Sequence, residues 1–413
     1  MRILHVNKFL YRRGGAEGYM LDVAEMQRAA GHDVEIFGMS HPDNPGSLPL
    51  QDTFAPFVEL EPPPGGLGAL RAASRMVWSR AAERGMTAAI DQFAPDVVHC
   101  HNIYHQLSPS VLAATRRAGV RCVMTLHDYK LACPSYQMLD HGKLCDACVG
   151  RTPLHAALRR CKSGSLPASA MLSLESMVHR STNAYDPVDL LISPSRFLAG
   201  VMERAGIGRD RLRVINHFVN LDAARPRSAD ADRGQAYVTF AGRLSSEKGV
   251  DTLIRAMTGT RADLHLHVAG DGPQGQDLRQ LAQQVAPGRV TFHGRLDKST
   301  LAALVAGSLA TVVPSRWYEN QPLTILESYA AQVPAVVTAL GGMPELVRHD
   351  VDGLVVPHDD PSSLGAALET LADDPDRARR MGVAGRERLS AEFAPDLHLQ
   401  RLQSAYTPGS TDG

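Results

Sequence analysis

The sequence predicts an α/β protein built from two doubly wound, parallel domains that face each other across a cleft. Short apolar runs alternate with helical stretches along most of the chain, which is the pattern of βα units in a parallel sheet. The alternation stops in a polar stretch, residues 214–235, and starts again near Tyr237. A chain of 413 residues is long enough for two such domains, each with its own core.

The first forty residues form one predicted βαβ unit. Residues 2–7 are typical of a strand, the glycine loop RRGGAEG follows, and Tyr19, Val23 and Met26 then share one face of a helix. Further strands of this domain are expected at residues 34–39, 96–100, 120–126 and 189–195.

The second domain repeats the same pattern. Its expected strands are residues 236–242, 264–270, 289–294, 310–315 and 334–339. Parallel strands end at one edge of a sheet, and open α/β sheets bind ligands outside that edge. We therefore expect the ligand site in the cleft between the two domains.

These patterns give the following domain boundaries: an N-terminal domain over residues 1–196 with a cysteine-containing insertion at about 133–161, a linker region over 197–235, a C-terminal domain over 236–388, and a helix within 389–413 that returns to the N-terminal domain. Irregular structure is expected in the Pro- and Gly-rich segment 62–68 and in a disordered tail, residues 407–413.

Composition argues against several classes of partner. The 43 basic and 44 acidic residues give a formal net charge of -1, so nothing in the overall charge favours nucleic acid. The chain has no signal peptide and no long apolar run, and this favours a cytoplasmic location. Two basic helical segments, 70–85 and 158–180, are candidates for an acceptor-binding face or for peripheral contact with the inner membrane face; ordinary amphipathic helices are the alternative. The oligomeric state stays open.

Four successive strand ends in the second domain carry loops suited to a nucleotide. AGRLSSEKG begins with Gly242 and places Arg243 and Lys248 where their charges could neutralise a diphosphate. AGDGP, with Gly270 and Asp271, lets a ligand approach the backbone closely. FHGRL and ENQPLTILE follow the next two strands. Simple turns could explain any one of these loops, but not their shared order and position.

Glu319 and Glu327 lie eight residues apart in the last of these loops. Pro322 favours the first turn of a helix, so the helix is expected to start near Gln321 or Leu323. Glu319 would then lie in the loop and Glu327 one to two turns into the helix. The helix N-terminus between them has free N–H groups that can bind an anion. An exposed helix with two solvated glutamates is the alternative.

Taken together, these motifs resemble the retaining GT-B glycosyltransferases of glycosyltransferase family 4. The resemblance covers nearly the whole chain, from GGAE through GRLSSEKG, GDGP and ENQPLTILE to GGMPELVRHDVDGLVV. It implies two Rossmann-like domains and transfer of a sugar from a nucleotide diphosphate-sugar donor to a hydroxyl of an acceptor. No cofactor is expected beyond the donor. The identities of the base, sugar and acceptor are left open.

The resemblance also implies roles for particular residues. Arg243 and Lys248 would contact the donor diphosphate, the region of Arg295 and Leu296 would hold the base, and Glu319 would bind hydroxyls of the donor sugar. Backbone amides would meet sugar or phosphate over Asn320, Gln321, Pro322, Leu323 and Thr324. Many family members carry Phe-Gly where this chain has Gln-Pro-Leu, which leaves the donor sugar open.

Glu327 is assigned to the ribose hydroxyls by the same resemblance. A carboxylate accepts two hydrogen bonds from neighbouring hydroxyls. With a spacing of eight residues, one glutamate would bind the ribose and the other would bind the transferred sugar. The chain offers no confident nucleophile. The expected reaction is therefore a front-face displacement in which the leaving phosphate, stabilised by Arg243, Lys248 and helix amides, takes the acceptor proton.

In the N-terminal domain, Gly14 and Gly15 form a loop expected to lie opposite the diphosphate. His127 in TLHDY matches the family histidine near the donor sugar and the acceptor, and His101 is a weaker candidate. The expected catalytic set is His127, Arg243, Lys248 and Glu319. Two Asp-x-Asp sequences, at Asp230 and Asp350, resemble metal motifs but are interpreted as structural.

A cysteine cluster lies in the insertion: Cys133, Cys145, Cys148 and Cys161. In a long chain without a signal peptide, thiols or a metal site are favoured over disulfides. A structural zinc with four thiolate ligands is the hypothesis, and buried free thiols are the alternative.

Two other functions fit the same architecture. A nucleotide-sugar epimerase would release an altered sugar nucleotide without any acceptor, and a non-catalytic protein would only bind the nucleotide sugar. A dehydrogenase is disfavoured because RRGGAEG is not Gly-x-Gly-x-x-Gly.

Overall fold

The computed structural model describes residues 1–58, 73–208, 210–220 and 235–407. Its contacts divide the chain into two compact units. The first unit contains Met1–His141, Cys145–Ile215 and Leu399–Gly413, and the second contains Gly142–Leu144 and Asn216–His398. Three predicted features lie outside the described residues: the irregular segment 62–68, the Asp230 motif and residues 408–413 of the tail.

The first unit is built on a six-stranded sheet in the order β2-β1-β3-β4-β7-β8, and every pair of neighbouring strands is parallel. The strand order reverses between β1 and β3, as it does in flavodoxin-like sheets. Its strands are β1 Arg2–Val6, β2 Asp33–Phe37, β3 Val97–Cys100, β4 Arg121–Thr125, β7 Leu190–Ser193 and β8 Leu212–Val214. The central strands β3 and β4 are almost wholly buried, as expected for a parallel sheet covered on both faces.

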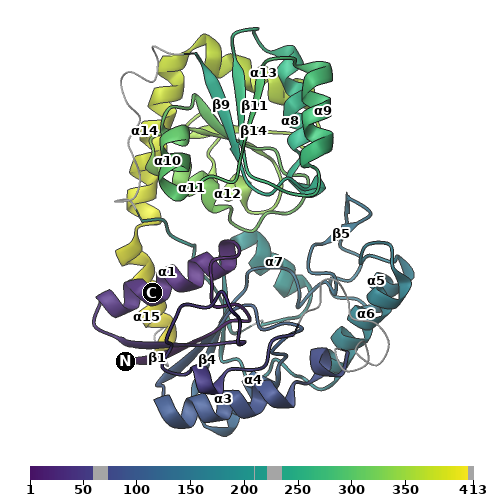
Figure 1. The fold of residues 1–413 in the computed structure, drawn as a ribbon, viewed down its shortest axis with the longest axis vertical. Helices are drawn as coiled ribbons and strands as arrows, with labels where there is room; N and C mark the ends of the chain where they lie inside the picture. Colours follow the sequence, from purple (N-terminus) through teal and green to yellow (C-terminus); the bar gives the residue numbers. More distant parts are fainter. Residues whose placement is uncertain (59–72, 209, 221–234, 408–413) are drawn as a thin grey trace. The chain divides into compact units, whose positions relative to one another are not determined.

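Helices surround this sheet (Figure 1). They are α1 Gly15–Ala29, α3 Arg80–Phe93, α4 Ser110–Arg117, α5 Leu154–Leu158, α6 Leu166–Ser181 and α7 Arg196–Arg204. Serine side chains cap three of them: Ser79 accepts from Ala82, Ser165 from Ala168 and Ser195 from Leu198. These caps satisfy N–H groups that the helix leaves without an internal partner.

The described residues between 197 and 214, part of the predicted linker region, contain regular structure instead. It forms α7 and the edge strand β8, and both belong to the first unit. β8 was not predicted from the sequence, because it has only three residues, LRV, and none of them is fully buried. The unit boundary falls between Ile215 and Asn216.

The second unit has a sheet in the order β11-β10-β9-β12-β13-β14, which is the strand order of a dinucleotide-binding Rossmann domain. Its strands are β9 Tyr237–Ala241, β10 His265–Ala269, β11 Val290–Gly294, β12 Ala310–Val313, β13 Ala335–Thr338 and β14 Gly353–Val356. All neighbouring strands are parallel, so their carboxyl ends meet at one edge.

The helices of the second unit are α8 Val250–Ala256, α9 Gly275–Val285, α10 Lys298–Ala306, α11 Leu323–Ala330, α12 Met343–Leu346, α13 Pro361–Asp373 and α14 Pro375–Glu392. The core lies between the sheet and α8, α9 and α13, where Val238, Leu253, Leu266 and Leu368 are fully buried. α11 begins at Leu323, which confirms the helix start predicted from Pro322.

The last helix, α15 Pro395–Tyr406, belongs to the first unit from Leu399 onward. Arg121 of β4 donates to the carbonyl of Ala405, and Gln27 of α1 donates to the hydroxyl of Tyr406 at 2.9 Å. α15 therefore packs beside α1 (Figure 1).

A short insertion follows β4 and contains the two-residue strands β5 Leu139–Asp140 and β6 Lys143–Leu144. A buried ion pair ties the start of this segment to α6: the Lys130 ammonium lies 2.8 Å from the Glu175 carboxylate. His105 also contacts Glu175, at 3.0 Å. Burial alone would raise the pKa of Glu175, but Lys130 and His105 outweigh burial and lower it to about 2. Glu175 is therefore charged and paired at neutral pH, which holds the loop beyond His127 in place.

No helix in the described part of the chain is long and apolar enough to cross a membrane.

Candidate functional site

The loops at the carboxyl edge of the second sheet are held together through their backbones. Gly242 donates to the carbonyl of Ala269 at 3.0 Å, and Gly270 donates to the carbonyl of Gly294 at 2.7 Å. Gly270 has a φ of +139°, and a Cβ there would lie 1.8 Å from the carbonyl oxygen of Gly242. Only glycine fits this contact, so Gly270 of the AGDGP motif serves loop packing whatever else it binds.

Lys248 and Glu319 form the most direct contact among the predicted site residues. The Lys248 ammonium donates to Glu319 Oε1 at 2.7 Å, and the Ser315 hydroxyl donates to the same oxygen at 2.7 Å. Glu319 is buried, whereas Lys248 keeps 24% of its side chain exposed. Burial by itself would raise the pKa of Glu319, but the charge of Lys248 and these hydrogen bonds lower it. Glu319 is therefore a buried carboxylate that carries its charge.

The backbone of Glu319 is positioned by the loop after β13. Gly342 donates to the carbonyl of Glu319 at 2.7 Å. The neighbouring Gly341 has a φ of +60°, and a Cβ there would lie 2.2 Å from the Glu319 carbonyl oxygen and 2.7 Å from its nitrogen. The Gly-Gly pair of the GGMPEL motif thus lets two loops touch where a larger residue would push Glu319 away.

A second contact holds the loop that carries Glu319 and was not predicted. Arg316 donates to Asp251 at 2.7 Å and to Thr252 at 2.6 Å, both in α8. Its backbone N–H also donates to the carbonyl of Glu247, at 2.8 Å. Arg316 therefore joins the loop after β12 to the helix after β9. The sequence gives one indication that Arg316 belongs to the site: it lies four residues after Val312, which is part of a buried strand.

Other predicted donor-binding residues also follow strands of this sheet. Arg243, after β9, is exposed, and within the described residues its guanidinium forms no ion pair. Arg295, after β11, is exposed, and Leu296 is partly buried. The Asp271 carboxylate accepts from the backbone of Gly272 at 2.7 Å, so part of its role is to shape its own loop.

The start of α11 carries the remaining candidates: Asn320, Gln321, Pro322, Leu323, Thr324 and Glu327. Pro322 occupies the N-cap, and no side chain caps the helix. Glu327 lies in the second turn of the helix, as the spacing predicted, and its side chain is exposed. The side chain of Gln321 is already engaged: it accepts from the backbone N–H of His217 at 2.7 Å and donates to the His217 carbonyl at 3.3 Å. For Gln321, the amide available to a ligand is thus the backbone one.

In the first unit, Gly14 is the N-cap of α1, and its carbonyl accepts from Gly18 at 3.0 Å. A Cβ at Gly15 would meet no atom within 4 Å. Packing in the first unit therefore does not explain the second glycine of the GGAE motif.

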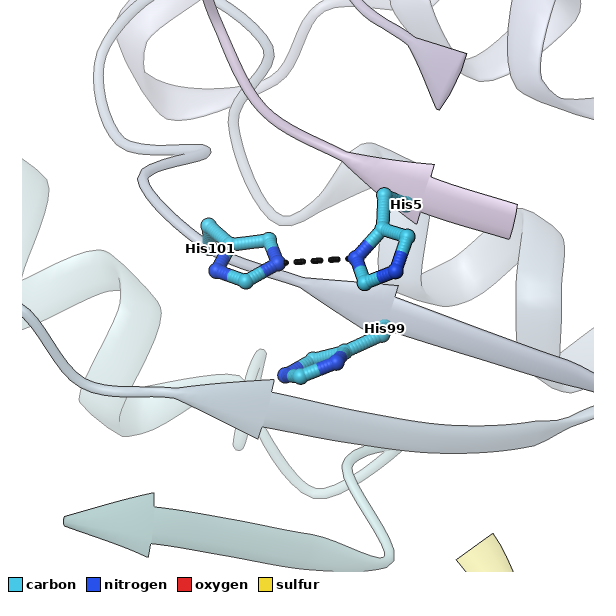
Figure 2. Close-up of side chains that lie close together, drawn as sticks. All are labelled: His5, His99 and His101. Atoms are coloured by element: carbon cyan, nitrogen blue, oxygen red, sulfur yellow. Dashed lines mark hydrogen bonds between the residues drawn. The ribbon is translucent and has the colours of Figure 1, made fainter. Parts of the chain in front are cut away.

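His127 follows β4 and belongs to a line of hydrogen-bonded histidines. His101 Nδ1 lies 3.0 Å from His127 Nε2, and His5 Nδ1 lies 3.0 Å from His101 Nε2. His5 Nε2 in turn lies 2.8 Å from Gln27 Oε1. Figure 2 shows His5 on β1 beside His99 on β3, with His101 just beyond β3. His101, a weak candidate by sequence, thus connects His127 to the core.

A branch of this network reaches the C-terminal helix. Gln27 Nε2 donates to the Tyr406 hydroxyl, which lies 2.7 Å from His99 Nδ1, and His99 Nε2 lies 2.7 Å from Thr125 Oγ1. The hydrogen bonds of His5, His99, Gln27 and Tyr406 were not predicted from the sequence. The available signal was a histidine at a buried position in each of two apolar strands, RILHV and VVHC.

The predicted cysteine cluster exists, and its four side chains line one small cavity of about 10 Å³: Cys133, Cys145, Cys148 and Cys161. All four are free thiols. Burial and the other three cysteines raise the pKa of Cys148 to about 12. In the described residues, a different group brings its potential ligand atoms within 4.8 Å of one another: His5, His99 and His101.

The Asp-x-Asp sequence at Asp350 is structural, as expected. Asp352 is fully buried and accepts from the Tyr329 hydroxyl at 2.8 Å and from Arg348 Nε at 2.6 Å. Asp350 pairs with Arg377 at 2.6 Å. Both carboxylates are therefore engaged within the second unit.

Two family models together match most of the chain. Residues 13–223 match the model of glycosyltransferase family 4, about half of the chain, and residues 223–388 match that of glycosyl transferases group 1. Sucrose-phosphate synthase from Thermosynechococcus elongatus superimposes with a TM-score of 0.73 and 22% identity over 98% of both chains. HepE from Anabaena, solved with UDP and glucose, gives a TM-score of 0.69 and 18% identity over 98% of both chains.

The fold is therefore GT-B, with two Rossmann-like units. The chain belongs to glycosyltransferase family 4. Among curated relatives, a glycogen synthase of Mycobacterium tuberculosis is 36% identical over 199 residues, 47% of each protein. The matched part is thus about half the length of that relative.

The contact between Gly341 and Glu319 predicts a large penalty for a single methyl group. Gly341→Ala should lower the free energy of unfolding of the second unit by well over the 1–2 kcal/mol that a left-handed alanine costs, because its Cβ would also meet backbone atoms. Gly288→Ala is the matched control, since Gly288 has a φ of +73° and open space around its Cβ position. Urea unfolding of both variants gives the comparison. Equal losses would show that the loop yields to the methyl group without cost.

Proposed function

We propose that the protein is a retaining glycosyltransferase that moves a sugar from a nucleotide diphosphate-sugar to a hydroxyl of an acceptor, without a metal ion in catalysis. The observation that carries this proposal is the Lys248–Glu319 contact at the carboxyl edge of the second sheet. It joins a cation that can bind a diphosphate to a charged carboxylate that can bind sugar hydroxyls. A nucleotide sugar contains these two groups next to each other.

The remaining donor contacts follow from the loops of the same sheet edge. Arg243 supplies a second positive charge, with no ion pair to another described residue. The uncapped N-terminus of α11 offers backbone N–H groups to phosphate or sugar oxygens. Glu327 accepts hydrogen bonds from the ribose hydroxyls, and the loop of Arg295 and Leu296 holds the base. Membership of the family supports this proposal in general terms.

In the proposed reaction, the bond between the anomeric carbon and the diphosphate oxygen breaks while the acceptor oxygen attacks from the same face. The acceptor proton passes to the departing phosphate oxygen. Negative charge grows on the leaving diphosphate in the transition state, so Arg243 and Lys248 bind it more tightly there than in the ground state. No enzymic nucleophile takes part, and the configuration at the anomeric carbon is retained.

The engagement of Lys248 by Glu319 adds a constraint on this mechanism. The ammonium must share its hydrogen bonds between Glu319 and the diphosphate when the donor binds. Glu319 therefore weakens binding of a diphosphate that lacks the sugar, since it competes for Lys248 and adds a nearby negative charge. With the intact donor, the sugar hydroxyls give Glu319 new partners.

Activity should be found by a donor screen and should not depend on a divalent cation. Thermal shift with UDP-, GDP-, ADP- and TDP-sugars should identify a stabilising donor, since a ligand that binds only the folded state raises the melting temperature. That donor, with an acceptor panel, should yield a glycoside in the presence of EDTA. Activity that disappeared in EDTA and returned with manganese would overturn the metal-free mechanism. An altered sugar nucleotide formed from donor alone would identify an epimerase instead.

Calorimetric titration of variants should distinguish the contributions of Lys248, Glu327 and Glu319 to ligand affinity. Lys248→Ala should weaken the nucleoside diphosphate of the preferred donor by roughly ten- to a hundredfold, the loss expected for a charged hydrogen bond. The exposed Lys298→Ala, at the start of α10, should have little effect. Glu327→Gln should weaken nucleoside diphosphate and donor alike.

Glu319→Gln should bind the nucleoside diphosphate as tightly as the wild type or more tightly, while kcat/KM for transfer falls. A substantial loss of nucleoside diphosphate affinity in Glu319→Gln would contradict the proposal that Glu319 binds the transferred sugar and not the nucleotide.

We further propose that the cysteine cluster holds a structural zinc. The four thiols line one cavity. Four cysteine thiolates are one of the ligand sets found in closed, structural zinc sites. Arg159 directs its guanidinium toward Cys145 Sγ at 3.8 Å, which would offset part of the negative charge of a four-thiolate site. The thiols that now raise one another's pKa would each release a proton to solvent and bind the metal as thiolates.

Elemental analysis should find close to one zinc per chain after removal of loosely bound metal. Cys148→Ser should lose the zinc and lower the melting temperature, whereas Cys122→Ala, in the buried strand β4 outside the cluster, should keep it. A wild-type protein without zinc would leave the four residues as buried thiols.

A further inference from the structure

The outward face of α6 is apolar, which is unusual for a helix on a protein surface. Its buried side chains share one face of the helix. The opposite face carries Leu166, Ala170, Leu174 and Met177 at spacings of three and four residues, and all four are exposed. Leu166 and Leu174 leave 47% and 52% of their surface open to solvent. A surface helix normally has polar or charged residues on this side.

The charged residues of α6 are engaged away from this face. Glu175 is the only charged residue between Leu166 and Met177, and it is buried 2.8 Å from the ammonium of Lys130. Arg180, in the last turn, donates to a backbone carbonyl at 2.7 Å. The outward face of the helix therefore carries no charged side chain from residue 166 to residue 177.

The short helix α5 also exposes apolar residues. Leu154 and Leu158 are one turn apart and leave 46% and 78% of their surface exposed, and no large apolar residue in the described ranges is more exposed than Leu158. α5 packs beside α6, where the Ser173 hydroxyl donates to the carbonyl of Pro153 at 2.9 Å (Figure 1). Of the eleven large apolar residues that are exposed in the described structure, five lie in these two helices. We call these five the α5–α6 surface: Leu154, Leu158, Leu166, Leu174 and Met177.

The turn between the two helices is basic. Arg160 lies in it and is exposed, and neither Arg160 nor the exposed Arg151 forms an ion pair with another described residue. Arg159 pairs with Asp140 at 3.0 Å. Between residues 141 and 185 the chain has six lysines and arginines but only two acidic residues, one of which is the buried Glu175. The surroundings of the α5–α6 surface therefore carry a net positive charge.

This combination of groups matches the surface of a bilayer that contains anionic lipids. Apolar side chains on a helix enter the boundary between headgroups and acyl chains, and nearby arginines attract the lipid phosphates. A second protein is a poorer match. The exposed parts of the five side chains add up to fewer than three fully exposed residues, whereas a standard protein interface takes about 20–30 residues from each partner.

We propose that the α5–α6 surface docks on an anionic lipid bilayer, with its apolar side chains in the acyl boundary and Arg151 and Arg160 at the lipid phosphates. The proposal does not depend on the reaction that the protein catalyses. It gives the cysteine insertion a use, because the buried Ala156 of α5 lines the cavity of the four thiols. The cluster would hold α5 so that Leu154 and Leu158 stay exposed to the lipid.

Flotation of the full-length protein with vesicles tests the docking. The protein should float with vesicles of phosphatidylcholine and phosphatidylglycerol in a two-to-one ratio, and much less with phosphatidylcholine alone. Added salt should weaken the binding, because it screens the charge of the arginines. Failure to float with the anionic vesicles, or equal binding to both kinds of vesicle, would overturn the proposal.

Substitution of two leucines should remove most of the binding. Leu158→Gln with Leu174→Gln should lower the partition coefficient at least about tenfold, since each leucine gains transfer free energy when it leaves water. The matched control is Val351→Gln with Val383→Gln, because these valines of the second unit are also exposed, at 47% and 44%. Both double variants should keep the wild-type melting temperature, since substitutions on the surface change stability little. Equal binding by the wild type and the leucine variant would contradict the proposal.

Charge substitutions test the arginines separately. Arg151→Gln with Arg160→Gln should weaken binding to the anionic vesicles severalfold and reduce its dependence on salt. Arg116→Gln with Arg255→Gln, which changes two exposed arginines of α4 and α8, should behave like the wild type. Equal losses in the two pairs would show that net charge alone attracts the protein to the vesicles, and would overturn the role of this surface.

A tryptophan placed in α5 reports contact with lipid directly. The fluorescence of Leu158→Trp should shift to shorter wavelengths when anionic vesicles are added, because the indole leaves water. Val383→Trp should show no shift. A Leu158→Trp spectrum that vesicles leave unchanged would overturn the proposal, even if the protein bound to them.

Self-association is the other use of an exposed apolar surface. Analytical ultracentrifugation without lipid should give the same oligomeric state for the wild type and for Leu158→Gln with Leu174→Gln. A dimer that these substitutions dissociate would assign the α5–α6 surface to a second copy of the chain and would overturn the proposal.

Discussion

A parallel sheet ends all of its strands at one edge, and the rest of the second unit follows from that constraint. The loops after β9, β10, β12 and β13 have to share this edge, so their backbones touch. Gly270 and Gly341 sit where a Cβ would strike another loop. The same crowding brings Lys248, from one loop, to Glu319, from another, although 71 positions separate them in the chain. The packing of the loops against one another therefore places the candidate site residues of this unit, because each loop is shaped by its neighbours.

The first unit meets a different constraint, which is the cost of burying polar side chains. His5 and His99 are opposite each other on two central strands and are fully buried. Each needs partners for both ring nitrogens, and the elements that cover the sheet supply them: Gln27 from α1 and Tyr406 from α15. The polar network therefore specifies which helices can cover this face and in which register. An apolar core of equal volume would pack as well but would not require these particular partners.

Local sequence signals were enough for most of the fold and for the location of the candidate site. Apolar runs predicted the long buried strands, and Pro322 predicted the start of α11. β8 and β14 were missed, since LRV and GLVV are too short to show a period. Partnerships between distant residues were also missed. The residues near Lys248 in the chain give no sign of its ion pair with Glu319. The residues near His127 likewise give no sign of its indirect connection to Gln27 through hydrogen bonds. Such pairs depend on tertiary proximity, whereas strand ends and caps depend on adjacent residues.

The place of α15 in the first unit has a consequence for biosynthesis. A ribosome synthesises residues 1–141 and 145–215 of this unit, and then residues 216–398 of the second unit, before it reaches residues 399–406. Until then, Gln27 and His99 lack the Tyr406 hydroxyl, and Arg121 lacks the carbonyl of Ala405. Domains usually fold in order as they emerge, but here the contacts of α15 with the first unit form only after the second unit has been synthesised. A nascent chain that stalls inside the second unit would therefore present an open histidine core, a feature that chaperones and proteases could recognise.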